Sequence, residues 1–289
     1  MFSLFPKSLA VRYTISLIVP ILVAATFVVR AEAKHRSETP KVKLTAKAPA
    51  TRNIDSGLFD PAEGYLKRGS REEKTLVLTF DDGPHPDSAE RLLDLLRELD
   101  VKATFFVVGE RVETHPEVVR RMLEEGHEVA NHTQDHLRLH ELPEAKIVEE
   151  LKDCEEAVKK ATGVGMAFMR PPGMRFTPKV MATAKSLGYI MVGVNNVAGD
   201  YVPNGGLSDL TPDEARELHL EPKDIADKVE RQFKPGTIIL LHDNPVTVEA
   251  VPDIVARARA QGYRFITTAE LMADLPEPVK VVANPPAKD

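Results

Sequence analysis

Tryptophan is absent from this 289-residue chain, cysteine occurs once, and aromatic residues make up only 6%. The one cysteine, Cys154, excludes an intrachain disulfide and a multi-thiolate zinc site; its helical surroundings favour a small buried hydrophobe over a nucleophile. With 38 basic and 44 acidic residues, the net charge is -6, which argues against nucleic acid as a partner. A composition with 43% hydrophobic and 28% charged residues excludes a disordered chain and a multi-span membrane protein. A globular domain acting on a neutral glycan fits these limits.

The one long apolar run lies near the N-terminus. Tyr13–Val29 is an uncharged run of 17 residues, preceded by Lys7 and Arg12 and followed by the small residues Ala31 and Ala33. This pattern predicts a signal peptide or an uncleaved signal anchor within residues 1–33. Basic residues before the run place the N-terminus inside and the rest outside. We therefore expect an exported protein, periplasmic or extracellular, either secreted or anchored in the cytoplasmic membrane by residues 13–29.

Two segments resemble connectors rather than folded structure. Residues 34–70 are rich in Lys, Ala, Thr, Ser and Pro and have no apolar period, which predicts a linker. Residues 276–289 contain four prolines, which predicts an extended C-terminal tail. One folded domain, residues 71–275, is expected between them.

Within that domain, short apolar runs alternate with helical patterns. Such runs are typical of strands buried on both faces, and the alternation predicts an α/β fold with a parallel sheet. The expected strands are Thr75–Phe80, Ala103–Val108, His127–Ala130, Ala167–Met169, Tyr189–Val194, Thr237–Leu241 and Arg264–Thr267. The expected helices are Ser88–Leu99, Pro116–Glu125, Pro143–Ala161, Pro178–Leu187, Pro222–Phe233 and Val248–Gln261.

Ionisable residues follow four of these strands directly. They are Asp81 and Asp82 after the first, His132 and His136 after the third, Arg170 after the fourth, and His242 and Asp243 after the sixth. In an open sheet the carboxyl ends of the strands form a line, whereas in a barrel they converge on one axial site. Convergence would bring these groups together, so we favour a barrel-like fold.

Asp82, His132 and His136 form a candidate metal site. The two histidines are four residues apart, and a helically turning backbone can present both rings to one ion. One carboxylate and two imidazoles suit Zn²⁺ or another borderline divalent ion and leave coordination positions open. A His-x-x-x-His pair alone is more often two solvated helix residues, but the position after a strand and the adjacent acids favour the metal site.

Three further residues are candidates for acid–base chemistry. If a metal holds Asp82, Asp81 can take a proton from the attacking water, although Asp-Gly-Pro is also good turn chemistry. His242 can protonate a leaving amine, although a histidine there is more often structural. Arg170 can clamp a carboxylate and tune the base, with an ordinary surface ion pair as the alternative.

Four motifs in this order resemble those of the polysaccharide deacetylases, the NodB-homology enzymes of carbohydrate esterase family 4. They are Thr79-Phe80-Asp81-Asp82-Gly83-Pro84, His132-Thr133-x-x-His136, Arg170-Pro171-Pro172-Gly173 and Leu240-Leu241-His242-Asp243. The resemblance spans about Thr75 to Leu271. It implies a distorted (β/α)7 barrel that hydrolyses the acetamide with metal-activated water, releasing acetate and leaving an amine on the sugar.

The resemblance also implies a role for each matching residue. Asp81 would be the general base, oriented by Arg170, and His242 the general acid. Asp82, His132 and His136 would hold the metal, most simply Zn²⁺, with Co²⁺ or Ni²⁺ as alternatives. Leu240 would line the acetyl pocket, and Pro172 and Gly173 would belong to the substrate site, where a backbone N–H stabilises the oxyanion.

Two departures from the family pattern affect the groove. The family motif Asp-x-x-Asp-Trp corresponds to Val197-Ala198-Gly199-Asp200-Tyr201, so Asp200, expected to orient His242, is kept. Tyr201 must supply any aromatic wall, because the tryptophan is missing. Gly173 is followed by Met174 where Tyr-Gly is frequent. Residues 202–221 form a long loop on the expected active-site side, either a substrate lid or a harmless insertion.

The predicted function is removal of N-acetyl groups from an N-acetylglucosamine-containing polysaccharide, such as peptidoglycan or a chitin-like chain. The same site acting on an O-acetyl or cyclic-amide substrate is an alternative. A non-catalytic glycan-binding protein of the envelope is a third hypothesis. It requires that a catalytic group be missing, and the sequence contains the base, the acid and all three metal ligands: Asp81, His242, Asp82, His132 and His136.

Overall fold

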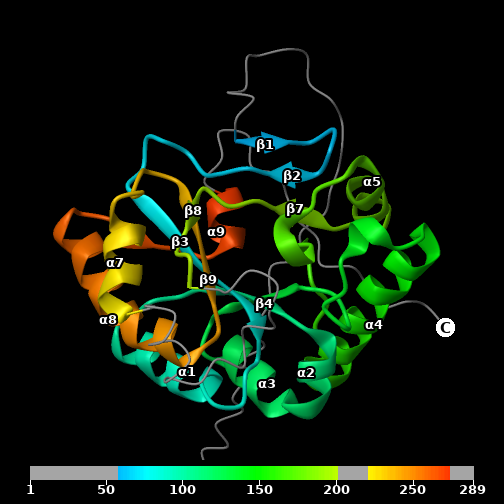
Figure 1. Ribbon diagram of the computed structural model, residues 1–289, viewed down its shortest axis with the longest axis horizontal. Coiled ribbons are helices and arrows are strands. Elements are labelled where there is room, and N and C mark those ends of the chain that lie inside the picture. Colours follow the sequence, from blue (N-terminus) through cyan, green and yellow to red (C-terminus); the bar gives the residue numbers. More distant parts are fainter. Residues whose placement is uncertain (1–57, 201–220, 274–289) are drawn as a thin grey trace, which may run out of the picture. The chain divides into compact units, whose positions relative to one another are not determined.

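The computed structural model describes residues 58–200 and 221–273 (Figure 1). The predicted signal segment, Tyr201, most of the 202–221 loop and the C-terminal tail lie outside these residues. The strands are β1 Phe59–Asp60, β2 Tyr65–Leu66, β3 Thr75–Gly83, β4 Thr104–Val107, β5 Glu128–Asn131, β6 Phe168–Met169, β7 Ile190–Val192, β8 Asn196–Val197, β9 Thr237–His242 and β10 Arg264–Phe265. The helices are α1 Ala89–Glu98, α2 Gly109–Thr114, α3 Pro116–Glu124, α4 Glu144–Thr162, α5 Pro178–Ser186, α7 Pro222–Glu230, α8 Pro245–Ala260 and α9 Thr268–Ala273, with 3-10 turns η1 Leu139–Glu141 and η2 Pro172–Met174.

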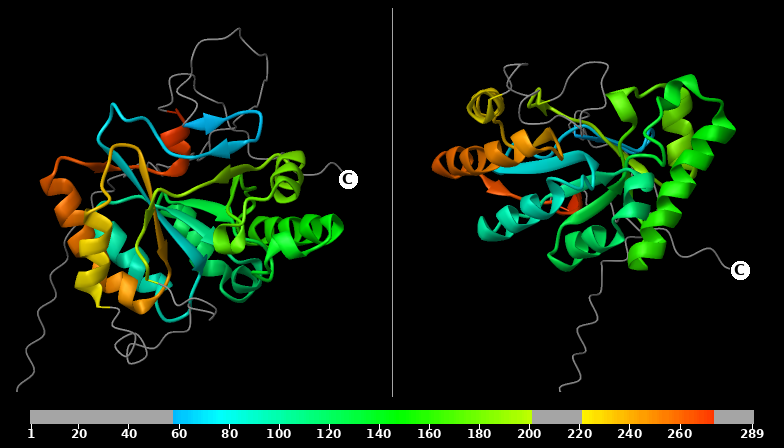
Figure 2. Two further views of the ribbon diagram at one scale, coloured as in Figure 1. Left: turned by 45° about the horizontal axis from the view of Figure 1, so that its top comes forward. Right: turned by 60° about the horizontal axis from the view of Figure 1, so that its bottom comes forward.

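One curled sheet organises the domain, with most helices on its outer side and α9 packed against its concave side through Leu271 and Met272 (Figures 1 and 2). The strand order is β1-β2-β7-β6-β5-β4-β3-β9-β8, and β10 also pairs with β3. Every pairing is parallel except β1 with β2. All seven predicted strands are present, which confirms the α/β class. Among the described residues no pairing joins β8 to β1, so the expected distorted barrel is a curled half-barrel.

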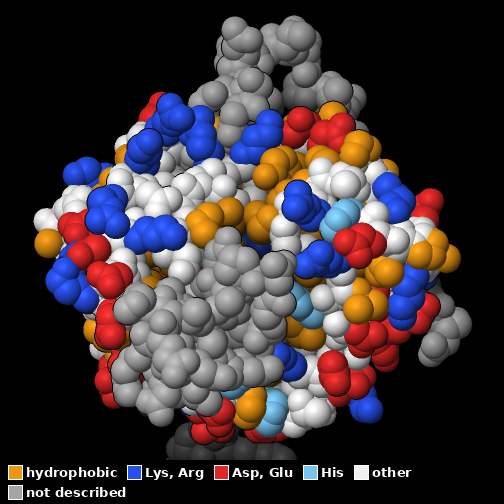
Figure 3. Space-filling model, viewed as in Figure 1, with side chains coloured by type: hydrophobic (Ala, Val, Ile, Leu, Met, Phe, Trp, Pro, Cys, Tyr) orange, Lys and Arg blue, Asp and Glu red, His pale blue; other side chains and the backbone are white. Residues whose placement is uncertain are grey.

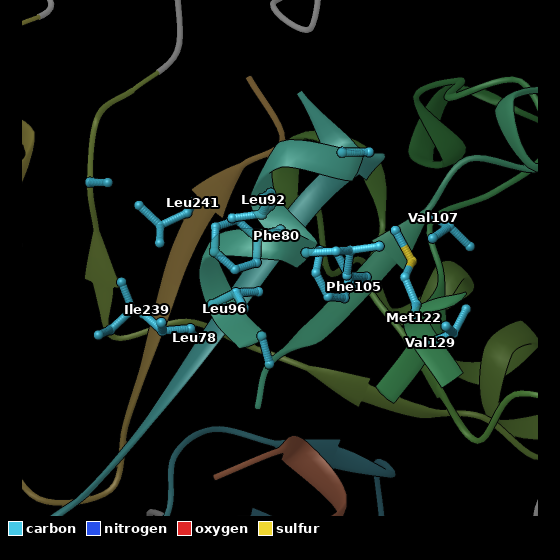
Figure 4. Packing of buried hydrophobic residues seen from close by; sticks show 14 of the residues in the cluster. Leu78, Phe80, Leu92, Leu96, Phe105, Val107, Met122, Val129, Ile239 and Leu241 are labelled. Atoms are coloured by element: carbon cyan, nitrogen blue, oxygen red, sulfur yellow. The ribbon is translucent and has the colours of Figure 1, made fainter. Parts of the chain in front are cut away.

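Alternation along β3 divides the apolar residues into two clusters. Val77 faces the concave side of the sheet, together with Phe106 and Ile238 from β4 and β9. Leu78 and Phe80 face the helices, where the Phe80 ring stacks on Phe105 at 5.3 Å and lies beside Leu92 and Leu96 of α1 (Figure 4). Each such side chain contributes roughly 1.5–3 kcal/mol through burial. This packing fixes which face of each strand carries the polar residues at its carboxyl end.

A hairpin corrects the predicted linker. β1 and β2 pair with each other and β2 pairs with β7, and the hairpin buries Leu58, Phe59 and Leu66. The part of residues 34–70 from Leu58 onward therefore belongs to the folded domain. Two-residue strands are too short to show an alternation of apolar and polar residues in the sequence. Their stability comes instead from pairing with a strand that is distant in the sequence. The same reason explains why β8 was not predicted.

Two helical details also differ from expectation. α2 and α9 were not predicted, since the six residues of each are too few for a helical period. α8 begins at Pro245, three residues earlier than expected, because the Asn244 side chain caps it by accepting the Thr247 N–H at 2.9 Å. Within residues 58–200 and 221–273, no helix is long and apolar enough to cross a membrane.

Candidate active site

Strand register places the two predicted acid–base residues side by side. β3 and β9 pair in parallel so that Asp81 lies opposite His242 and Thr79 lies opposite Leu240. These four residues share the concave face of the sheet, two residues apart along each strand. The polar layer at the carboxyl ends therefore sits directly above the apolar layer of Val77 and its neighbours.

An irregularity at the end of β3 separates the two adjacent acids. The register between β3 and β4 shifts between Asp81 and Gly83, and Asp82 has a left-handed φ of 71°. Arg111 of α2 donates to the Asp82 carbonyl oxygen at 2.8 Å. Such a bulge re-aims side chains, so neighbouring carboxylates take different environments. Asp81 faces Arg170, and Asp82 faces the two histidines.

Asp82, His132 and His136 form the predicted cluster. Asp82 Oδ1 lies 3.2 Å from His132 Nε2 and 3.0 Å from His136 Nε2, and the three ligand atoms lie within 4.8 Å of one another. Burial acts to raise the pKa of Asp82, but the histidine contacts hold that pKa well below its usual value. Asp82 Oδ1 is buried and makes no regular hydrogen bond. A carboxylate oxygen and two imidazole nitrogens thus point at one small volume, which fits a divalent ion.

The loop that carries the histidines is not helical, which corrects the expected geometry. Thr133 and His136 have φ values of 73° and 54°. The loop is held instead by Asn131, whose Oδ1 accepts the Thr133 N–H and whose Nδ2 donates to the Leu151 carbonyl, both at 2.8 Å. His132 Nδ1 lies 2.8 Å from the Arg170 carbonyl oxygen. This second contact orients the ring so that Nε2 faces Asp82.

Arg170 lies in the interior beneath Asp81. Its side chain is fully buried, and its guanidinium donates to Asp81 Oδ1 at 2.5 Å and to Thr79 Oγ1 at 2.8 Å. The guanidinium also stacks over the Phe106 ring at 4.0 Å. Burial lowers the pKa of Arg170, and Asp81 acts in the opposite direction. The predicted clamp on a carboxylate is present, and the alternative of a surface ion pair is wrong.

His242 is paired with the acid that the sequence proposed for it. His242 Nδ1 lies 2.9 Å from Asp200 Oδ1, and the His242 backbone N–H donates to Asp200 Oδ2 at 2.7 Å. Thr247 Oγ1 donates to the same Oδ2 at 2.6 Å. Burial alone would lower the pKa of His242, but the charge and hydrogen bond of Asp200 raise it to about 9. A protonated imidazole therefore stands beside the Asp81 carboxylate.

The remaining predicted residues take varied positions. Leu240 is 6% exposed on β9, Pro172 is buried, and Gly173 adopts a φ of 67° within η2, directly after β6. They lie at or near the carboxyl ends of their strands. Tyr201 falls outside the described residues, so the aromatic wall expected from it stays a prediction.

One buried carboxylate was missed as a site residue. Asp243 Oδ1 accepts the Ser88 hydroxyl at 2.6 Å, and Oδ2 accepts the His85 N–H at 2.9 Å. Its backbone N–H donates to the Asp81 carbonyl at 3.1 Å. A side chain at Gly83 would place its Cβ 2.8 Å from Asp243 Oδ2. Asp243 thus connects the loop after β3 to the end of β9. Both Gly83 and Asp243 stand in the sequence motifs quoted above, but their proximity in space could not be read from the sequence.

The fold and these paired groups define a hydrolase site at the carboxyl ends of an α/β sheet. Residues 68–192 match the family described as polysaccharide deacetylase. A peptidoglycan-N-acetylglucosamine deacetylase of Bacillus cereus is 34% identical over 212 residues, covering 69% of this chain and 89% of that protein. The peptidoglycan-N-acetylmuramic acid deacetylase PdaA of Bacillus subtilis is 33% identical, covering 71% and 73%. The crystal structure of the Bc1960 peptidoglycan N-acetylglucosamine deacetylase has a TM-score of 0.65 at 26% identity, covering 72% of this chain and 92% of that one.

The chain belongs to the polysaccharide deacetylase family, and it is an enzyme of that family. The family is metal-dependent in general, and the described residues contain one group that could hold an ion, the Asp82, His132 and His136 cluster.

Proposed function

We propose that this enzyme removes the acetyl group from N-acetylglucosamine units of peptidoglycan or a similar chitin-like chain outside the cytoplasm. Relatives named for peptidoglycan deacetylation support the substrate. The observation that carries the reaction is the register of β3 and β9, which sets a carboxylate opposite a protonated imidazole beside a His-His-Asp cluster. Base, acid and metal ligands are then within reach of one acetamide group.

The residues present fit a divalent ion. A buried carboxylate oxygen without a regular hydrogen bond faces two imidazole nitrogens, of which that of His132 is oriented by the Arg170 carbonyl. This mixed donor set suits Zn²⁺, with Co²⁺ or Ni²⁺ as substitutes. When bound, the ion supplies a Lewis acid that polarises the acetyl carbonyl and acidifies water.

Asp81 is the proposed general base. Arg170 donates to Asp81 Oδ1, and this contact orients the carboxylate. Asp81 Oδ2 lies 4.0 Å from His132 Nε2, on the side of the cluster. It accepts the proton of the water that adds to the acetyl carbon.

His242 is the proposed general acid. Asp200 holds Nδ1 and keeps the ring protonated, so Nε2 donates a proton to the sugar nitrogen as the C–N bond breaks. Acetate and a free amine result. Leu240, next to Thr79 in the register, is proposed to line the acetyl pocket, and the backbone at Pro172 and Gly173 to donate to the oxyanion. Tyr201 is proposed as the aromatic wall of the groove.

Acetate release tests the reaction. The full chain is incubated with N-acetylglucosamine oligomers, peptidoglycan and O-acetylated xylan, with added Zn²⁺ and after chelation. We expect acetate from the N-acetylated substrates with metal and none after chelation. Release from O-acetylated xylan alone would replace the proposed substrate, and glycan binding without any release would favour the non-catalytic alternative.

Asp81→Asn tests the base. We expect a loss of about 10²–10⁴-fold in kcat, because the amide cannot take the proton. Metal content should remain near that of the unchanged protein, since Asp82 carries the ligand atom. Asp87→Asn is the matched control, because Asp87 is exposed in the loop that follows β3. Full activity of Asp81→Asn would refute this assignment.

Export is proposed from the sequence alone. Cell fractionation of the full chain, with the N-terminus of the recovered protein determined, separates secretion from anchoring by residues 13–29. Recovery of uncleaved protein in the cytoplasm would refute both.

A further inference from the structure

A basic pocket lies away from the site described above. It has a volume of about 360 Å³ and is lined by four cationic side chains: Arg68 and Arg71 from the segment between β2 and β3, and Arg231 and Lys234 after α7. The described residues that line it include no acid. Figure 3 shows Lys and Arg side chains gathered on this part of the surface, above the connection from β2 to β3 and near α7.

This concentration is unusual for a chain with a net charge of -6. Arg71, Arg231 and Lys234 carry like charges around one hollow and repel one another, and an anion in the hollow relieves that repulsion. Arg71, Arg231 and Lys234 are exposed, so their charged groups can reach a ligand from solvent. Three of the four cations are arginines, whose planar guanidinium groups bind phosphate with two parallel hydrogen bonds. The chemistry of the pocket therefore matches a phosphate group.

The pocket is separate from the catalytic residues. It includes Thr237, the first residue of β9, whereas His242 is the last. At ~3.3 Å per residue these ends are roughly 17 Å apart. None of its lining residues contacts the cluster around Asp82, so an acetylated sugar held for hydrolysis does not explain the four cations.

The position of the pocket indicates where the phosphate comes from. The Leu58 carbonyl accepts the backbone N–H groups of Lys67 and Arg68 at 2.8 and 3.3 Å, so the first described residue lies beside Arg68, which lines the pocket. Residues 1–57, which precede Leu58 in the sequence, include the apolar run Tyr13–Val29. Residues 30–57, which follow it, contain seven Lys or Arg against three Asp or Glu. An apolar anchor combined with basic surface is the usual way to hold a protein on an anionic membrane.

We propose that the pocket of Arg68, Arg71, Arg231 and Lys234 binds the phosphate of an anionic phospholipid headgroup. This inference rests on the anchoring by residues 13–29 proposed above, and the pocket then docks this face of the domain on the same membrane. Each basic residue near an anionic membrane surface strengthens the electrostatic attraction to that surface, and added salt weakens this attraction by screening. The catalytic residues, at the other end of β9, are left accessible to a polymer beyond the membrane.

Vesicle binding of the full chain tests this proposal. Vesicles of phosphatidylcholine alone are compared with vesicles containing about one third phosphatidylglycerol, at about 0.1 M and about 1 M NaCl. We expect about ten-fold or greater preference for the anionic vesicles at low salt, lost at high salt. The double variant Arg71→Glu/Arg231→Glu should lose about ten-fold of that binding. Its acetate release from a soluble oligosaccharide should match that of the unchanged chain.

Lys152→Glu/Lys160→Glu is the matched control, since it reverses two exposed charges on α4. It should lose less than about two-fold of the binding, because it lies outside the pocket. Equal losses in both double variants, or no loss in the pocket variant, would overturn the proposal. Inorganic phosphate is added at constant ionic strength as a second arm. One outcome is that phosphate raises the unfolding temperature of the unchanged chain but not of the pocket variant, while vesicle binding is the same for both. That outcome would assign the pocket to a soluble anion and overturn the proposed binding of a lipid headgroup.

Discussion

Two histidines at opposite ends of the sheet, the buried His127 and the largely buried His242, have opposite electrostatic environments. His242 ends β9 at the catalytic side, where Asp200, Asp81 and Asp82 surround it and raise its pKa to about 9. His127 directly precedes β5 at the other side, where burial, with help from the charges of Lys102 and Arg121, lowers its pKa to about 4. One side chain type is thus held charged at the carboxyl ends of the strands and neutral at their amino ends.

The difference separates a histidine suited to chemistry from one that only packs. His127 accepts the Ala103 N–H at 3.2 Å and contacts the Phe105 ring edge-on at 5.4 Å, so a neutral ring is what its site requires. His242 has a carboxylate on its Nδ1, so a charged ring is what its site requires. The two affect stability oppositely: His242 contributes fully below pH ~6.5 and loses this as pH rises through ~9, whereas His127 contributes above pH ~6.5 and loses this as pH falls towards ~4.

The largest expected effect comes from removing the charge that distinguishes His242. Asp200→Asn should lower the pKa of His242, because burial then acts without the carboxylate, and it should favour the wrong tautomer. We expect kcat at neutral pH to fall by about 10²–10⁴-fold. The alkaline limb of the pH–rate profile, where the acid loses its proton, should move to lower pH.

The measurement is a full pH–rate profile of Asp200→Asn and the unchanged enzyme, loaded with the same metal. Asp253→Asn on α8 is a suitable control, since the Asp253 side chain is 46% exposed and pairs with Arg257 of the same helix. An alkaline limb that stays in place would show that Asp200 does not set the proton affinity of His242.

Much of this contrast could be predicted from sequence, because it depends on position relative to strands. Buried apolar runs located the strands, and the one or two residues after each run located Asp81, His132, Arg170 and His242 at one end. Once strands are parallel and adjacent, their carboxyl ends must share an edge. The pattern of residues therefore contained the proximity of the groups, although not their distances.

What could not be predicted depends on contacts between distant, short or irregular segments. The hairpin of β1 and β2 is stable only on β7, and the link from Asp243 to Ser88 spans 155 residues. The left-handed φ of Asp82 arises where β3 shifts register against β4. None of these contacts produces a periodic pattern in the sequence. The complete burial of Arg170 likewise depends on residues from other strands, such as Thr79 and Phe106.

A smaller effect is expected from acid at His127. As pH falls from about 6.5 to about 4, the unfolded chain takes up a proton that the folded site resists, so unfolding free energy should drop by about 3 kcal/mol. His127→Asn keeps an acceptor for the Ala103 N–H but cannot titrate in this range. Denaturant unfolding of both proteins across this interval should therefore show a shallower acid slope in the variant, and equal slopes would mean that His127 is not the group responsible.

The smallest predicted change concerns Thr247, whose hydroxyl supports Asp200 rather than His242 itself. Thr247→Val keeps the shape and removes the donor to Asp200 Oδ2, while the His242 backbone N–H still holds that oxygen. A hydrogen bond to a charged group contributes roughly 1.5–3 kcal/mol to stability, and only part of this affects the orientation of the carboxylate. We expect kcat to fall by about three- to ten-fold, about 1 kcal/mol, with the alkaline limb nearly in place because the Asp200 charge remains. A loss as large as that of Asp200→Asn would instead mean that His242 depends on the position of the carboxylate more than on its charge.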